Sequence, residues 1–315
     1  MQAVFGPVPS RRLGRSLGID PVPLKTCNWN CVYCQLGATS NFALERKEYV
    51  SRDLILSQLE DALDVHKEAG IDWITFVGSG ETCLNNQLGN MIAAVKQRTS
   101  LPIAVITNGS LLYDPQVRSE LSLADAVMPS LDAADDHLYR RINRAHPSLT
   151  LDSLVNGIKA FRREYSGNLW IEVMLVSGLN DAPQALGALA KLMDEIGPDE
   201  IHLLLPTRPP VENWVNPPKR EEILRALLIL GNRAKLFETS EGDFELNSSE
   251  TVAEALVSIL TRHPMLEEDA LEAIEKRLPG EGEKTLRELI AAGRVSTVNR
   301  QGKHFYSASG SKYHR

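Results

Sequence analysis

Short apolar runs rich in β-branched residues recur along the first 240 residues and alternate with longer amphipathic stretches. The short runs predict buried strands, whereas apolar residues spaced three or four apart predict helices that pack on those strands. The predicted strands cover residues 73–77, 103–107, 126–131, 169–176, 201–205 and 234–238. The predicted helices cover residues 52–69, 151–165, 183–196 and 219–230. An extended segment, residues 18–26, precedes them all.

Regular alternation of strands and helices predicts an α/β fold, because short right-handed connections between such elements build a parallel sheet. The number of repeats predicts a full or partial (β/α)6 parallel barrel. In either form, the functional residues are expected at the carboxyl ends of the strands, where the connecting loops meet.

The hydrophobic pattern changes near residue 263. The elements predicted around and beyond this point are helices over residues 251–262, 266–276 and 283–292 and a hairpin of strands over residues 295–298 and 304–307. This order predicts a small winged-helix-like domain over residues 246–307, following a larger domain over residues 1–245. Residues 308–315 are predicted to be a mobile tail, as chain ends often are.

Composition narrows the class of protein. The 315 residues are 43% hydrophobic and 24% charged, with a formal net charge of −7, which is typical of a globular protein. No apolar run approaches the roughly 18 to 20 residues of a membrane span, and the first residues lack the pattern of a secretory signal. Four cysteines in a chain of this length are not a disulfide framework. A cytoplasmic protein without a membrane partner is therefore expected.

Three of the four cysteines, Cys27, Cys31 and Cys34, form a C-x3-C-x2-C run just after the extended segment. A structural zinc site needs four ligands and usually combines two distant pairs, although a zinc loop remains an alternative. Three thiolates on a [4Fe–4S] cluster instead leave one iron open for chemistry. The remaining Cys83 has the usual character of a small buried hydrophobe, so no cysteines are left for a second cluster.

The cysteine run, with the aromatic Tyr33 inside it, resembles the motif of the radical SAM superfamily. This resemblance implies one [4Fe–4S] cluster on Cys27, Cys31 and Cys34, whose open iron is chelated by S-adenosylmethionine. Reductive cleavage of the sulfonium would release a 5′-deoxyadenosyl radical that abstracts hydrogen from a substrate. It also implies an electron donor such as flavodoxin or ferredoxin.

Further stretches resemble the superfamily at the ends of the predicted strands. Gly78, Ser79, Gly80 and Glu81 resemble the segment that holds the methionine amino group, and a charged ammonium in a dry pocket needs such an acceptor. The other positions at which the resemblance implies cofactor contacts are Asn108, Ser130, Asp132 and Glu172.

Several of these positions also have a purely structural interpretation. The glycine-rich segment would serve as a turn that caps the next helix, and Asn108 would belong to a turn after its strand. Asp132 would serve as the N-cap of a helix that begins near residue 135. Weaker candidates are Arg140, Arg141, Arg144, Asn180, Asp181, His202 and Arg208. Among the three neighbouring arginines, at least one is expected to be a solvated residue on a helix face.

Residues 5–18 and 128–133 resemble a narrower group, the uncharacterised radical SAM proteins grouped with the tRNA wyosine-base synthases, over roughly residues 1–240. The synthases carry additional N-terminal cysteines for a second cluster, and no cysteine precedes Cys27 here. The resemblance makes RNA modification the first function to consider. Radical modification of a peptide or a small molecule and a non-enzymatic iron–sulfur regulator with a DNA-binding winged helix are the alternatives.

The predicted C-terminal domain adds little to this choice. Its candidate recognition helix, residues 281–292, mixes acidic and basic side chains, which suits a phosphate backbone poorly. The basic residues from position 294 onward, which no acidic residue accompanies, are Arg294, Arg300, Lys303, Lys312 and Arg315. Such a patch fits contact with RNA, docking of a protein partner or an ordinary solvated end.

Overall fold

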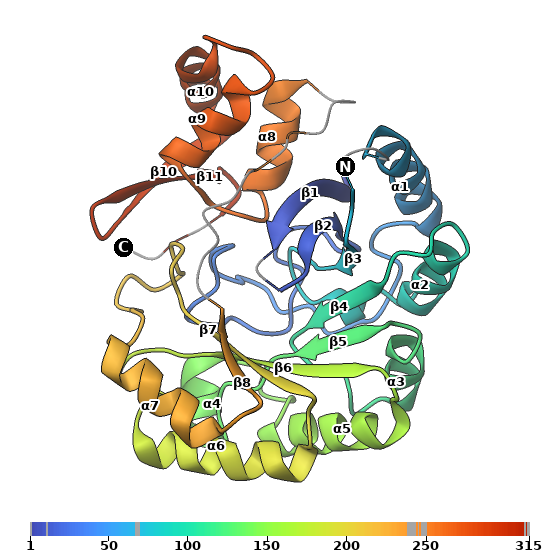
Figure 1. Cartoon of the computed structure of the whole chain (residues 1–315), viewed down its shortest axis with the longest axis vertical. Helices are drawn as coiled ribbons and strands as arrows, with labels where there is room; N and C mark the ends of the chain where they lie inside the picture. Colours follow the sequence, from blue (N-terminus) through green and yellow to red (C-terminus); the bar gives the residue numbers. More distant parts are fainter. Residues whose placement is uncertain are drawn as a thin grey trace.

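The computed structural model describes residues 2–10, 12–66, 70–237, 244, 246, 251–311 and 313. Its largest part is a single curved sheet in which every strand pairs with the next strand in the sequence (Figure 1). The strands are β1 (Val4–Ser10), β2 (Gly14–Ile19), β3 (Trp73–Phe76), β4 (Ile103–Thr107), β5 (Ala126–Pro129), β6 (Asn168–Met174), β7 (Glu200–Leu204) and β8 (Ala234–Phe237).

The sheet is a partial barrel. Strands β2 to β8 run parallel, whereas β1 pairs antiparallel with β2. Within the described ranges β1 and β8 are the two edges of the sheet, because no pairing joins them. The predicted α/β fold of parallel barrel type is therefore confirmed in its partial form.

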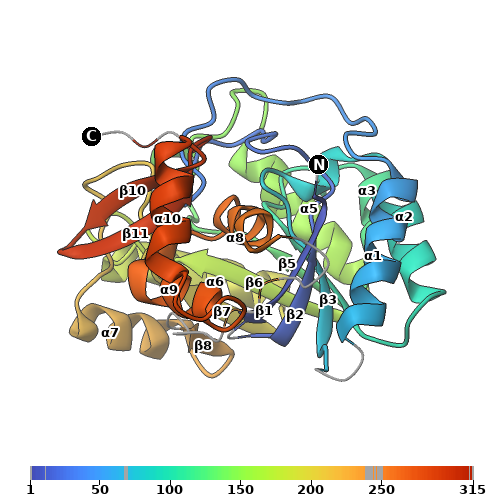
Figure 2. The same ribbon diagram turned by 90° about the horizontal axis from the view of Figure 1, so that it is seen from above.

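Helices cover the convex face of the sheet (Figures 1 and 2). They are α1 (Arg52–His66), α2 (Leu88–Lys96), α3 (Pro115–Leu121), α4 (Asp136–Ile142), α5 (Leu151–Glu164), α6 (Pro183–Ile196) and α7 (Arg220–Leu230), with a short 3-10 helix, η1, at Thr82–Leu84. In α5, Thr150 caps the first turn by accepting a hydrogen bond from the Ser153 amide. Its buried residues Leu154, Ile158 and Phe161 recur at helical spacing and join the core of the barrel.

The N-terminal hairpin differs from the predicted extended segment. Residues 18–26 contain only the end of β2, and the rest of that segment is loop. The sequence did not predict strand β1, because this segment contains Pro7 and Pro9 and proline is uncommon inside strands. A proline cannot donate to a ladder but is tolerated on an edge strand, which is where β1 lies.

A separate C-terminal module, residues 251–311, follows the barrel. Its elements are α8 (Val252–Leu260), β9 (Met265–Leu266), α9 (Glu267–Glu275), α10 (Gly282–Ala291), β10 (Val295–Arg300) and β11 (Lys303–Ala308). The three strands form a small sheet in the order β10-β11-β9. The helices and the hairpin thus lie where the sequence predicts them, with the short strand β9 in addition.

The C-terminal module docks against both sides of the open barrel. Its apolar core includes Phe5 and Val8 of β1, and Figures 1 and 2 both place it beside that strand. At the other side, the Arg300 guanidinium donates hydrogen bonds to the Pro206 and Val215 carbonyl oxygens at 2.5 and 3.1 Å. The module therefore spans the gap that the partial barrel leaves, and Arg300 serves this contact.

Part of the predicted tail is fixed to the barrel. The Tyr313 hydroxyl donates a hydrogen bond to the Gln35 carbonyl oxygen at 2.7 Å and lies 3.0 Å from the Ser307 hydroxyl. Residues 312, 314 and 315 lie outside the described residues. Tyr313 therefore contacts the residue that directly follows Cys34.

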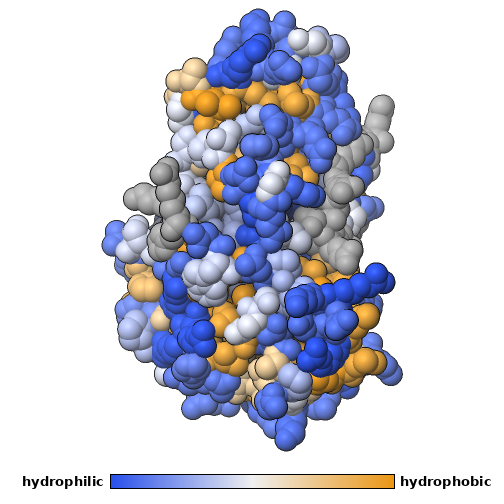
Figure 3. Space-filling view, turned by 90° about the vertical axis from the view of Figure 1, so that its left-hand side faces the viewer, coloured by the Kyte–Doolittle hydropathy of each residue, from blue (hydrophilic) through white to orange (hydrophobic). Residues whose placement is uncertain are grey.

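The face shown in Figure 3 is mostly hydrophilic. Hydrophobic residues form small separate groups on it. None of the helices in the described ranges is both long and apolar enough to cross a membrane.

Candidate active site

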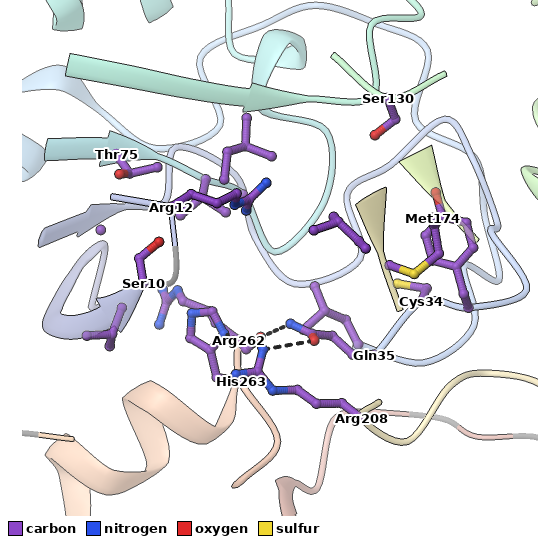
Figure 4. A pocket seen from close by; sticks show the side chains of 18 of the residues that line it. Ser10, Arg12, Cys34, Gln35, Thr75, Ser130, Met174, Arg208, Arg262 and His263 are labelled. Carbon is purple, nitrogen blue, oxygen red and sulfur yellow. Dashed lines mark hydrogen bonds between the residues drawn. The ribbon is translucent and has the colours of Figure 1, made fainter. Parts of the chain in front are cut away.

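A cavity of about 390 Å³ lies at the carboxyl ends of the parallel strands, beneath the C-terminal module. Cys27, Cys31 and Cys34 line it together, and Figure 4 shows Cys34 among the side chains around the cavity. The other predicted site residues that line it are Gly78, Gly80, Glu81, Asn108, Ser130 and Arg208. Residues that are far apart in the sequence thus converge where an α/β fold places its functional groups.

The cysteine loop, residues 27–34, is part of the connection between β2 and α1, and hydrogen bonds attach it to the end of α4. The Asn30 and Val32 amides donate hydrogen bonds to the Asn143 and Ile142 carbonyl oxygens at 3.1 and 2.9 Å. The Tyr33 hydroxyl donates to the buried Asp132 carboxylate at 2.6 Å. The loop conformation therefore depends on side chains and carbonyls from the region after β5.

Two of the three thiols, Cys27 and Cys31, lie in a setting that favours the protonated form. Burial raises the pKa of Cys27 to about 12 and that of Cys31 well above its usual value. The only ammonium that contacts a cysteine in the described part of the chain belongs to Lys25, whose Nζ donates to Cys34 Sγ at 3.2 Å. Burial alone would lower the pKa of Lys25, but its electrostatic interactions with the cysteines, Cys34 first, and its hydrogen bond to Cys34 raise the pKa overall.

The donor set fits a cluster better than a single ion. Among the described residues, no three His, Cys, Asp or Glu side chains converge as ligands of one metal ion. A [4Fe–4S] cluster binds each thiolate through a different iron, so its ligands stand farther apart than those around one zinc. Cys27, Cys31 and Cys34 are three half-buried thiols that line one cavity, and such a donor set fits a cluster with one open iron.

The glycine-rich segment after β3 packs directly on the start of the cysteine loop. The Lys25 amide donates to the Ser79 carbonyl at 2.7 Å, and the Glu81 amide donates to the Thr26 carbonyl at 2.8 Å. A Cβ atom on Gly80 would lie 1.8 Å from the Thr26 carbonyl oxygen. Glycine is therefore required at this position for the contact between two backbone segments.

The Glu81 carboxylate organises the floor of the cavity. It is buried and accepts hydrogen bonds from the Thr107 hydroxyl at 2.6 Å, the Asn108 amide at 2.7 Å and the Cys83 amide at 2.9 Å. Burial raises its pKa, and these three donors oppose the rise. A carboxylate oxygen has about two acceptor positions, and among the described residues Glu81 Oε2 accepts a hydrogen bond only from the Asn108 amide.

Asn108 joins this group to the cysteine loop. Its side-chain amide donates to the side-chain oxygen Oδ1 of Asn28 at 2.7 Å and lies 4.0 Å from Cys27 Sγ. Glu81, Asn108 and Cys27 therefore lie next to one another, although the first two follow different strands.

Three predicted cofactor contacts do not line the cavity. Ser79 hydrogen-bonds to the buried Asp20 through both its amide and its hydroxyl. Asp132 accepts from Tyr33, the Asn143 side chain and the Met174 amide. Glu172 forms an ion pair with Arg12. These side chains support residues around the cavity, and their role towards a cofactor stays a prediction.

Known proteins are similar to this chain in sequence and fold. The family model of the radical SAM superfamily matches residues 22–189, which include the cysteine loop and strands around the cavity. The chain belongs to the radical SAM superfamily. It is also 36% identical over 311 residues to a UPF0026 protein of Methanocaldococcus jannaschii, a match that covers 97% of this chain and 96% of that one.

Solved radical SAM structures have the same fold. A radical SAM methyltransferase from Sphaerobacter thermophilus superposes with a TM-score of 0.54 at 19% identity, over 70% of this chain and 66% of that chain. A structure of native anSMEcpe with bound AdoMet gives 0.53 at 17% identity, over 78% and 66%. The protein is thus a radical SAM enzyme, and the regulator without enzymatic activity is set aside.

The weaker candidates mostly have structural roles in this radical SAM fold. Arg140 hydrogen-bonds to the Ala145 and His146 carbonyls, Arg144 forms an ion pair with Glu212, and Arg141 is exposed on α4. The Asn180 side chain bonds to the Asp132 and Met174 carbonyls, and Asp181 accepts from the Gly178 amide. None of these five lines the cavity, whereas Arg208 does.

Several cavity residues were not predicted from the sequence. They are Arg12, Gln35, Arg262 and His263, and Lys25, which contacts Cys34 from outside the cavity lining, was not predicted either. Lys25 and Gln35 flank the cysteine motif, and that closeness was the one signal that would have found them. Arg262 and His263 lie in the C-terminal module, and no local pattern relates them to the cysteines.

His202 of β7 is a structural residue whose burial predicts a pH effect on stability. It packs between Trp170 and Phe237, is only 1% exposed, and burial lowers its pKa to about 4. Its unfolded pKa is about 6.5, so its contribution is complete above that pH and is lost as the pH falls to 4.

When the pH falls from 6.5 to 4, the unfolding free energy of the wild type should drop by about 3 kcal/mol more than that of the His202→Gln variant. Denaturant titrations at several pH values measure this difference. Equal pH dependence in the two proteins would contradict the assignment. Other groups that titrate in this range, such as the half-buried His263, remain in both proteins.

Proposed function

We propose that this enzyme holds one [4Fe–4S] cluster on Cys27, Cys31 and Cys34 and uses S-adenosylmethionine to abstract hydrogen from a substrate. The observation that carries the proposal is the convergence of these three half-buried thiols with the buried Glu81 on one cavity. When bound, the cluster supplies the electron that cleaves the sulfonium and releases a 5′-deoxyadenosyl radical.

The residues of the chain have distinct tasks in this proposal. The open acceptor position of Glu81 receives the methionine ammonium, and Asn108 keeps Glu81 aligned with Cys27. Ser130 lines the cavity at the end of β5 and is placed to meet polar groups of the cofactor. The C-terminal module covers the cavity and excludes water from it, which protects a radical from side reactions.

RNA is the first candidate substrate. The resemblance of residues 5–18 and 128–133 to proteins grouped with the tRNA wyosine-base synthases supports it. The helix–strand–helix–helix–hairpin order of the C-terminal module supports a winged-helix-like domain of the kind that some nucleic-acid-binding proteins use. A small molecule is the second candidate, because the C-terminal module lies over the cavity and a large substrate would have to reach past it.

The test begins with anaerobic reconstitution of the cluster in the full-length protein. Dithionite and S-adenosylmethionine should then give 5′-deoxyadenosine, and a flavodoxin or ferredoxin with its reductase should replace dithionite. Addition of unmodified tRNA should raise the rate if RNA is the substrate, whereas a rise only with small-molecule extracts favours the second candidate. A cluster-loaded protein that forms no 5′-deoxyadenosine would overturn the proposal.

The Lys25–Cys34 contact predicts a shift in cluster potential. A hydrogen bond to a cluster thiolate stabilises the reduced state, because reduction adds negative charge to the sulfur ligands. We expect Lys25→Met to lower the reduction potential by roughly tens of millivolts, and Lys25→Arg to restore part of the loss. A redox titration followed by electron paramagnetic resonance measures it, with the exposed Lys303 changed to Met as control. An unchanged potential in Lys25→Met would contradict the role of the contact.

A further inference from the structure

Three arginines line the cavity, and their charges are balanced differently. Arg12 forms an ion pair with Glu172, and Arg262 Nε donates to the buried Asp20 carboxylate at 2.8 Å. Arg208, in the segment after β7, forms no ion pair with any described carboxylate. Among the described residues its hydrogen-bond partners are neutral: Gln35 Oε1 lies at 3.2 Å and His263 Nδ1 at 3.4 Å (Figure 4).

Among the described residues, the charge of Arg208 therefore has no ion-pair partner at the cavity wall. A guanidinium stays protonated in proteins, and removing an unpaired charge from water is costly even when the side chain is half-buried, as Arg208 is. Burial lowers the pKa of Arg208 to about 10, and the charge of Asp269 opposes this without pairing with it. Burial also keeps His263 neutral by lowering its pKa well below the usual value, so its Nδ1 accepts from Arg208.

Gln35 places Arg208 close to the proposed cluster. Its side-chain carbonyl accepts from Arg208, while its amide donates to the Arg262 carbonyl oxygen at 2.9 Å. Gln35 also directly follows Cys34 in the sequence. The cysteine loop, the segment after β7 and the C-terminal module thus meet at the Arg208 guanidinium, which faces the same cavity as the three thiols.

We propose that Arg208, held by Gln35 and His263, forms a subsite for an oxyanion group of the substrate, either a carboxylate or a phosphate. Only one guanidinium nitrogen is used by the two protein partners, which leaves the other nitrogens for the two-pronged contact that carboxylates and phosphates prefer. The inference rests on the proposed function, because it names the chemistry of the substrate that the same site would take.

The test uses the full-length protein without cluster and two probes, inorganic phosphate and acetate, titrated at constant ionic strength. Saturable thermal stabilisation in the millimolar range is expected for the anion type that the subsite prefers. Arg208→Gln should weaken that binding at least tenfold, Arg208→Lys should retain part of it, and the control Arg141→Gln, on the exposed face of α4, should bind as the wild type does. The absence of saturable binding, or equal binding in Arg208→Gln, would overturn the proposal.

A second titration separates the substrate subsite from the cofactor site. S-adenosylmethionine itself carries a carboxylate, so the phosphate and acetate titrations are repeated on cluster-loaded wild-type protein that is saturated with it. Unchanged anion affinity is expected, whereas competition would assign Arg208 to the cofactor and overturn the subsite. Formation of 5′-deoxyadenosine by the same preparation tests the proposed function separately, because the first titration needs neither cluster nor cofactor.

Discussion

The Cys31→Ala variant is expected to lose the [4Fe–4S] cluster and, with it, all formation of 5′-deoxyadenosine above background. The three thiols that line the cavity are the complete cysteine set there, so the remaining two cannot replace the missing ligand. The loss should exceed the roughly 10- to 100-fold effect that follows when a group supporting a metal ligand is removed. Iron and sulfide content, the visible absorbance of the cluster and the yield of 5′-deoxyadenosine measure it.

Cys83 provides a matched control for this variant. It is buried beside η1, and its thiol lies 3.4 Å from the Thr107 hydroxyl outside the cavity lining. Cys83→Ala should keep the full iron content and lose only some stability, because a small buried side chain becomes smaller. A cluster that survives in Cys31→Ala and disappears in Cys83→Ala would refute the ligand assignment.

The Gly80→Ala variant is expected to lose the cluster although no ligand is changed. The added methyl group would lie 1.8 Å from the Thr26 carbonyl oxygen, which is backbone and cannot turn away as a flexible side chain can. The segment after β3 and the start of the cysteine loop must then separate. The cost should be at least the roughly 1–3 kcal/mol of an overpacked core, together with loss of the thiol geometry.

A second glycine supplies the control for this variant. A Cβ atom on Gly187, inside α6, would meet no atom within 4 Å. Gly187→Ala should therefore raise the unfolding free energy by about 0.5–1 kcal/mol and leave cluster loading unchanged. Chemical denaturation and iron content, measured on both variants, decide the matter. Full cluster loading in Gly80→Ala would show that the contact between Gly80 and Thr26 is not required.

The sequence predicted the α/β fold because its signals are local. Strand and helix patterns repeat within a few residues, and the parallel order follows from short right-handed connections. The strand β1 was missed, because its prolines indicate a turn unless the strand lies on an edge. Whether β1 is an edge depends on the whole sheet.

Some residues of the candidate site could be recognised from their neighbours in the sequence, and others could not. Cys27, Cys31 and Cys34 are close in sequence, so their spacing alone predicted a shared ligand set, and the turn before Glu81 could be recognised from its own residues. The functions of Asp132 and Glu172 could not be read in this manner. Both are acidic residues near strand ends, but the partners that engage them, Tyr33 and Arg12, come from distant parts of the chain.

What the sequence by itself determined is a cysteine motif on an α/β scaffold, because spacing and periodicity are properties of neighbouring residues. Only the tertiary structure decided that the C-terminal module covers the cavity and that Arg262 neutralises Asp20, its partner 242 positions away. It likewise brought Arg208 to Gln35 across 173 positions and left its charge facing the cavity. Charge balance in a buried site depends on which distant groups meet there, and no local pattern records that.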